Sequence, residues 1–182
     1  TIRFNVTPQG YPPFMIVSEQ GDVSGIMFDV LSQIADSLGF TVQPMRIPRK
    51  RESRMINAKQ LDAVSRAIEW TKDPDQYLFT DEIISARDVL FSTTASPVEF
   101  ERVEDLFGHT IRTHLGFRYP TLDQHFSSGR ITRIDGTDNV AMLAKLLRNT
   151  ERFSGVLMNE SVGLWLIKQQ GWNGRIQPSK AA

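Results

Sequence analysis

The sequence contains no cysteine, so it can form no disulfide, no thiolate metal site and no cysteine nucleophile. Its histidines, His109, His114 and His125, are scattered, and no pair has the H-x-x-x-H spacing of many zinc sites. Basic and acidic residues balance at 21 each, which gives no general electrostatic reason to bind nucleic acid or an anionic membrane. No apolar run approaches the ~20 residues that span a bilayer. We therefore expect no metal, no cofactor and no nucleic-acid partner.

What the sequence does contain is an alternation of strand-like and helical segments, which predicts an α/β protein with open sheets. The expected strands of the first half are 2–6, 14–17, 23–26, 41–45, 61–64 and 83–93, and its expected helices are 28–38 and 50–57. In the first helix, one apolar face is predicted to hold Phe28, Leu31, Ile34, Ala35 and Leu38.

The pattern begins afresh after the polar stretch that ends at Pro97. A helical turn is expected at 103–107, strands at 110–113, 131–134 and 154–158, and a helix at 120–126 with proline in its first turn. Asp138 and Asn159 are placed to cap two further helices, the second of which runs to Gln169, and Ile176 begins a return strand. Two α/β units joined by such a linker predict a ligand cleft, lined by strand ends and helix N-termini.

Several segments, in this order along the chain, resemble the periplasmic (extracellular) solute-binding proteins of family 3, which include the amino-acid-binding proteins of ABC transporters. The resemblance rests on Tyr11-Pro12-Pro13-Phe14, Gly25-Ile26-Met27-Phe28-Asp29-Val30, Gln60-Leu61-Asp62-Ala63, Tyr77-Leu78-Phe79-Thr80, Asp105-Leu106-Phe107-Gly108, Gly116 and Asp138. Each match alone is weak, but their common order and spacing cover nearly the whole chain.

The resemblance implies a two-lobed, hinge-linked periplasmic binding protein type II fold. Residues 1–93 would form lobe 1 and residues 94–182 lobe 2, with hinge segments at 91–95 and 176–179 and the second crossover near 176–182. Family members continue for several elements after the second crossover, so we expect further chain beyond Ala182 to complete lobe 1.

The function implied is extracytoplasmic, periplasmic binding of a small polar or anionic solute, an amino acid or related acid. Hinge closure over an interlobe cleft would precede delivery to the membrane permease of an ABC importer, and the protein would be a monomer and not an enzyme. Two alternatives stay open at this point. One is the ligand-sensing domain of a membrane receptor. The other is a prephenate-type dehydratase on the same fold, with Asp29, Glu69 or Glu160 as acid or base.

Both ends of the family's amino-acid clamp are altered in this sequence. The resemblance places an arginine for the ligand carboxylate within the stretch 71–75, where none stands. It places an aspartate for the ligand ammonium at Asn159. An uncharged amide cannot form the stronger, charge-assisted bond to an ammonium. Glu160, one residue on, is a candidate to substitute for it.

The candidate ligand-binding residues that remain are cationic or aromatic. Tyr11 would flank the ligand, and Arg49 or Arg51 would grip an anion, unless these arginines only begin a solvated helix. Arg66 follows the strand of Asp62 and would contact the ligand or join an ion pair between lobes. The other candidates are Glu69, Trp70, Phe117 and Arg118, of which Trp70 alternatively belongs to the core and Arg118 to the surface.

Overall fold

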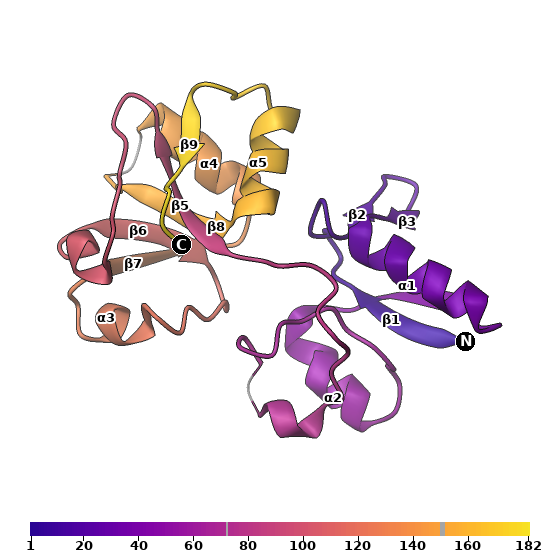
Figure 1. Ribbon diagram of the computed structural model, residues 1–182. Coiled ribbons are helices and arrows are strands. Elements are labelled where there is room, and N and C mark those ends of the chain that lie inside the picture. The colour runs from indigo at the N-terminus through magenta and orange to yellow at the C-terminus, as the bar shows by residue number, and fades with distance from the viewer. Residues whose placement is uncertain (72, 150–151) are drawn as a thin grey trace. The chain divides into compact units, whose positions relative to one another are not determined.

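The computed structural model of the protein describes residues 1–71, 73–149 and 152–182, and Figure 1 shows the elements along the chain. The chain forms two compact units, Thr1–Ala67 and Ile68–Ala182. The lobe boundary expected at residue 93 is not tested by this division into units, and it stays a prediction.

The first unit is built on two parallel strands, β1 (Ile2–Val6) and β4 (Val42–Arg46), which pair along their full length. Between them lie an antiparallel hairpin of β2 (Ile16–Val17) and β3 (Val23–Ser24), within the two strand ranges expected there, and the helix α1 (Ile26–Ser37). A 3₁₀ turn, η1 (Arg49–Arg51), leads into α2 (Glu52–Asn57).

The strand predicted over 61–64 is wrong, because only Ala63 forms a parallel bridge, to Phe4. The backbone N–H groups of Asp62 and Ala63 both donate to the Arg3 carbonyl. The Asp62 carboxylate accepts two further bonds from the Arg3 guanidinium, at 2.8 Å from Nε and 2.6 Å from Nη2. The segment is thus fixed at one point by side-chain and backbone bonds instead of a strand ladder.

Alternation along β1 sends successive side chains to opposite faces of the strand pair. Phe4 and Val6 form a buried cluster that packs on Met27, Phe28 and Leu31 of α1.

The predicted apolar face of α1 is buried only in part. Ala35 is buried, but Ile34 and Leu38 are 49 % and 66 % exposed. A sheet of two strands covers only part of the helix, so these two side chains remain in solvent.

The second unit contains a five-stranded sheet in the order β7-β6-β8-β5-β9. Its strands are β5 (Asp88–Thr93), β6 (Thr110–His114), β7 (Thr132–Gly136), β8 (Gly155–Asn159) and β9 (Ile176–Pro178). Strands β6, β7 and β8 run parallel, whereas β5 runs antiparallel to both β8 and β9. The strand predicted over 83–93 therefore begins only at Asp88 and belongs to the sheet of the second unit.

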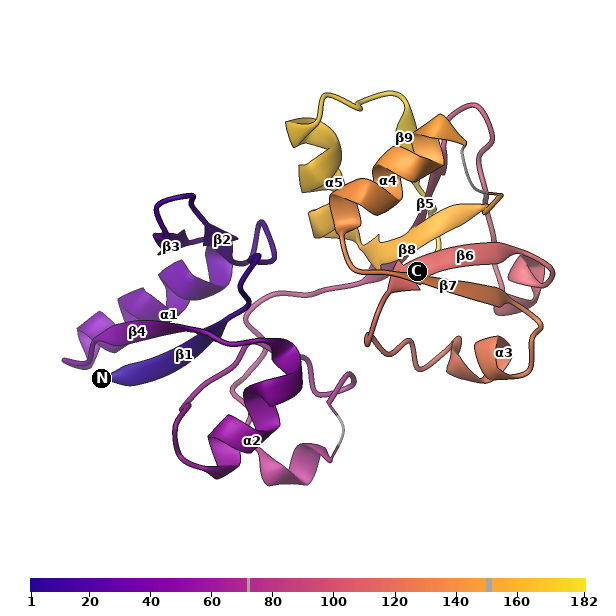
Figure 2. The ribbon, with the colours of Figure 1, turned by 180° about the vertical axis from the view of Figure 1, so that it is seen from behind.

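Helices cover both faces of this sheet (Figures 1 and 2). The helices α4 (Asn139–Arg148) and α5 (Glu160–Gln169) lie on one face and α3 (Asp123–Ser127) on the other. Two 3₁₀ turns, η2 (Pro74–Gln76) and η3 (Val103–Leu106), complete the unit. No helix among the described residues is both long and apolar enough to cross a membrane.

The two predicted helix caps are confirmed. Asp138 accepts a bond from the Ala141 N–H at 2.8 Å, and Asn159 accepts one from the Val162 N–H at 3.2 Å. The helix predicted over 120–126 begins later, at Asp123. There the carboxylate of Asp123 accepts the N–H of Tyr119, which holds the preceding turn outside the helix.

Candidate functional site

In the first unit, three segments leave the same edge of the sheet. Strands β1 and β4 and the bridge at Ala63 all run parallel, so the residues that follow them emerge together. Tyr11 follows β1, Arg49 and Arg51 follow β4, and Arg66 follows the bridge. Four residues predicted from the sequence are therefore brought to one edge of one unit.

Arg66 is held by a buried carboxylate. Its Nη2 donates to Glu52, and the side chains of the two residues are only 12 % and 7 % exposed. The amide of Asn5 also donates to Glu52, while its oxygen accepts the Ile47 N–H at 3.2 Å. This network ties β1, β4 and α2 together and fixes the Arg66 guanidinium in position.

The Tyr11 ring lies between the core of the first unit and solvent. Its ring stacks on Phe14 with centroids 5.9 Å apart, and it packs on the buried cluster of Phe4, Val6 and Met15. Its N–H donates to the Met15 carbonyl at 2.7 Å, and its side chain keeps partial exposure. The ring is therefore anchored in the core with one part open to solvent.

Arg49 and Arg51 lie in the turn η1, where both residues are exposed. Glu69 and Trp70 belong to the second unit, in the stretch before η2, where Glu69 is exposed and Trp70 half-buried. In the neighbouring stretch 71–75, Thr71 is buried, and Lys72 lies outside the described residues.

The second unit offers a comparable edge, where the parallel strands β6, β7 and β8 end and the antiparallel β5 begins. Phe117 and Arg118 follow β6. The Phe117 ring lies 4.4 Å from that of His114, and the exposed Arg118 lies 3.9 Å from Asp123.

Asn159 and Glu160 are already engaged with their neighbours. Asn159 is 3 % exposed, and its side-chain oxygen caps α5. The carboxylate of Glu160 accepts two bonds of 2.7 Å from the Arg87 guanidinium, which lower its pKa. Glu160, the candidate to replace the missing aspartate, is thus already paired with Arg87 of its own unit.

A further carboxylate at this edge, Asp88, escaped the sequence analysis. It is the first residue of β5 and stands directly opposite Asn159 in the β5–β8 register. Burial raises its pKa to about 6. The available signal was an aspartate at the head of the apolar run Val89-Leu90-Phe91, where a charge is costly.

Asp135 and Tyr119, also at this edge, are both hydrogen-bonded. Asp135 accepts bonds from Thr113 at 2.7 Å and from Arg133 at 2.8 Å. Burial by itself raises the pKa of Asp135, but these two bonds outweigh it and leave the pKa lowered. The Tyr119 hydroxyl accepts the His114 N–H at 3.3 Å.

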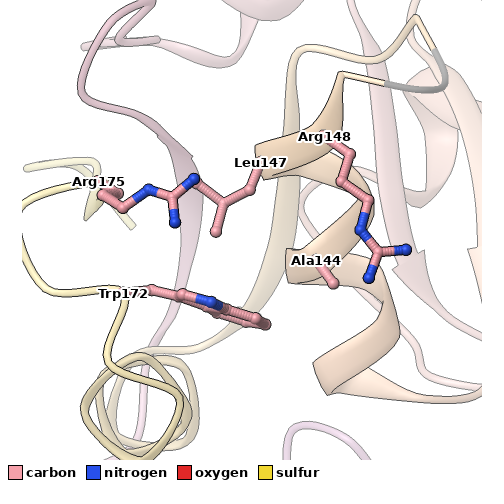
Figure 3. A pocket seen from close by; sticks show the side chains of 5 residues that line it. All are labelled: Ala144, Leu147, Arg148, Trp172 and Arg175. Carbon is pink, nitrogen blue, oxygen red and sulfur yellow. The ribbon is translucent and has the colours of Figure 1, made fainter.

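Two pockets lie in the second unit. One, of about 280 Å³, is lined by Arg112, Asp135, Gly136, Thr137, Asp138, Ala141, Met142 and Lys145. The smaller, of about 140 Å³, has a wall of Trp172 and Arg175 facing Ala144, Leu147 and Arg148 (Figure 3). Because α4 starts just after the carboxyl end of β7, the larger pocket adjoins the strand-end edge and the smaller lies toward the other end of the helix.

Two α/β units, each with charged and aromatic groups where its parallel strands end, define the class of two-lobed binding proteins. Residues 4–171 match the family model of bacterial extracellular solute-binding proteins, family 3, and the chain belongs to this family. The family and its structural relatives are binding proteins.

Solved structures support the type II periplasmic binding protein fold. The arginine-bound form of truncated ArgBP from T. maritima has a TM-score of 0.74 at 19 % identity, and the match covers 100 % of this chain and 82 % of that chain. An arginine 3rd transport system periplasmic binding protein from Legionella pneumophila gives 0.73 at 16 % identity, with 98 % and 79 % covered. An ancestral arginine-binding protein bound to arginine gives 0.74 at 19 %, with 98 % and 77 % covered. At such identities these likenesses establish the fold alone. No curated protein sequence matches the chain.

Proposed function

We propose that the protein binds a small polar solute, an amino acid or related acid, in the periplasm and delivers it to the permease of an ABC importer. Its family consists of extracellular solute-binding proteins, and one similar structure is the substrate binding protein of an amino acid ABC transporter. The observation that carries the proposal is the gathering of Tyr11, Arg49, Arg51 and Arg66 at one sheet edge of the first unit.

The proposed binding groups divide by chemistry. Arg49 and Arg51 supply cations for a carboxylate, since a guanidinium matches its geometry in bidentate fashion. Tyr11 supplies an aromatic wall, held by its stacking on Phe14. Arg66 contributes a positioned charge beside Glu52.

Binding is proposed to close lobe 2 over lobe 1, because contacts made only in the closed state favour that state. The hinge segments are 91–95 and 176–179. Their strands, β5 and β9, pair with each other through Phe91 and Pro178, Ser92 and Gln177, and Thr93 and Ile176. Paired segments would bend together, which suits a hinge of two strands.

The test is a thermal-shift screen with the standard amino acids, dicarboxylates and aromatic acids, followed by calorimetry on each hit. A ligand at 1,000 times its Kd adds about 4 kcal/mol to the free energy of unfolding. Arg49→Ala is expected to weaken binding by about 1.5–3 kcal/mol, the range for hydrogen bonds to charged groups. Arg54→Ala, an exposed arginine on α2, is the matched control and should leave affinity unchanged.

The outcomes separate clearly. A solute that stabilises the protein and loses affinity only in the Arg49 variant supports the proposal. Equal affinity in both variants removes Arg49 from the site. A screen in which no solute raises the unfolding midpoint contradicts solute binding itself.

A further inference from the structure

The carboxylate of Asp88 lies at the strand-end edge of the second unit, and none of the described residues supplies it with a side-chain partner. The side chain is half-buried, and among the described residues no hydrogen bond or ion pair reaches it. Burial is the one effect that shifts the pKa of Asp88, and it disfavours the charged form of the carboxyl group. Half-buried carboxylates are ordinarily paired, because removing a charge from water without compensation is costly.

The surrounding charges do not compensate Asp88. Arg87, its neighbour in sequence, donates both of its bonds to Glu160. Arg133 donates to Asp135 at 2.8 Å and also to the carbonyls of His114 and Phe117.

Neither Tyr119 nor Asn159 supplies a positive charge to Asp88. Tyr119 is buried and feels the charges of both Asp88 and Asp135, and burial raises its pKa, so its hydroxyl stays neutral. Asn159, opposite Asp88 on β8, uses its side-chain oxygen as a helix cap. His114, at the end of β6, has its ring Nδ1 beside the Leu115 carbonyl at 3.1 Å.

The register explains how Asp88 comes to face this edge. Residues directly opposite one another on antiparallel strands point to the same side of a sheet. Asp88 and Asn159 therefore share a side, two residues beyond the pair Leu90 and Leu157, which are buried in the cluster around Tyr119. The carboxylate thus stands where the apolar core ends and the strand-end loops begin.

We propose that Asp88 binds a cationic nitrogen, an ammonium or guanidinium, of the solute. This inference rests on the proposed function and narrows its solute class from polar acids in general to those that carry a positively charged nitrogen. A solute cation would give the carboxylate the charge-assisted bonds that no described residue provides. Unpaired, desolvated carboxylates of this kind are typical of functional sites.

The experiment measures Kd by calorimetry for the wild-type protein and for Asp88→Asn, which keeps the shape and removes the charge. The panel is the standard amino acids, arginine among them, with succinate as an acid without nitrogen. For a nitrogen-bearing solute, Asp88→Asn is expected to raise Kd roughly 10- to 100-fold, as loss of a charged hydrogen bond does. Glu104→Gln is the control, because Glu104 is exposed in η3, before β6 and so away from the edge where β6 ends.

A second readout does not depend on the variant. The carboxyl carbon signal of Asp88 in NMR follows its titration, and a bound cation must move its midpoint from about 6 to lower pH. The affinity of the wild-type protein should fall as the pH drops below that midpoint, while the affinity of Asp88→Asn stays flat over the same range.

Three results would overturn the inference, and they differ from one another. Tight binding of succinate, with no response to nitrogen-bearing solutes, rejects the solute class. Equal Kd values for wild type and Asp88→Asn, with an unmoved titration midpoint, reject the residue but leave the proposed function standing. Absence of binding by every solute rejects the proposed function together with the inference.

Discussion

Removing Arg66 should damage the fold of the first unit more than its binding surface. The change Arg66→Ala leaves the carboxylate of Glu52, at 7 % side-chain exposure, without its cation. Removing one partner of a buried ion pair typically costs about 3–5 kcal/mol, because the other charge stays buried and uncompensated. The amide of Asn5 still donates to Glu52, so we expect a loss near the lower end, about 3 kcal/mol.

A double-mutant cycle separates this effect from simple loss of packing. Glu52→Gln in the Arg66→Ala background removes the stranded charge, and the double variant should recover about 1–3 kcal/mol relative to Arg66→Ala alone. The assay is urea unfolding followed by tryptophan fluorescence and circular dichroism. Exposed Arg54→Ala serves as the reference for loss of an arginine from the same unit, within about 0.5 kcal/mol of wild type.

A cost below about 1 kcal/mol for Arg66→Ala, the worth of a surface pair, would show that Arg66 and Glu52 do not form a buried ion pair. If Glu52→Gln brings no recovery of stability, the buried charge of Glu52 is not the source of the loss. The prediction bears on function as well. A weakened affinity in Arg66→Ala reports on the site only when the variant is shown to be folded at the temperature of the binding measurement.

Three further predictions concern the second unit. Because the pKa of Asp88 is raised to about 6 in the folded protein, the free energy of unfolding falls as the pH rises from about 4 to 6. Asp88→Asn should therefore be as stable as wild type near pH 4 and more stable by roughly 2–3 kcal/mol above pH 6. Thermal unfolding of both proteins at several pH values measures this difference. Gly163→Ala would place a Cβ 2.2 Å from the Phe91 ring, and an overpacked core of this kind should cost about 1–3 kcal/mol in urea unfolding; an unchanged midpoint would contradict the packing. Asn159→Ala should cost about 1 kcal/mol in urea unfolding through the lost bond to the Val162 N–H, and an unchanged midpoint would contradict the cap.

The parts of the fold that depend on local signals follow from the sequence. The caps at Asp138 and Asn159 need only a short polar side chain ahead of an apolar helix, and both are present as predicted. The alternation of residues 2–6 likewise identifies β1.

The predictions that are wrong concern segments whose secondary structure or burial depends on contacts with residues elsewhere in the chain. Residues 61–64 have the composition of a strand, but the bonds between Asp62 and Arg3, far apart in sequence, leave a single bridge. Ile34 and Leu38 have the spacing of a buried face, and only the narrowness of the sheet decides that they are exposed.

The candidate site shows the same division. Strand order places Tyr11, Arg49 and Arg66 at one edge, and the sequence suffices to predict that much. It cannot say that Arg66 is bonded to Glu52, because Glu52 lies on a different element and its burial depends on tertiary packing. Asp88 was missed because its local signal, a charge at the head of an apolar run, does not reveal its register with Asn159, which depends on the pairing of two strands.

The pairing of β5 with β9 also bears on how the second unit is connected. The two strands are antiparallel, and the Ser179 N–H donates to the Leu90 carbonyl at 2.8 Å, so the start of the first strand and the end of the last are neighbours. A segment whose two ends meet can be spliced into a host chain without stretching it, or rejoined end to end in circular permutation. Residues 88–179 therefore have the form of a module that evolution, or an engineer, can exchange as one piece.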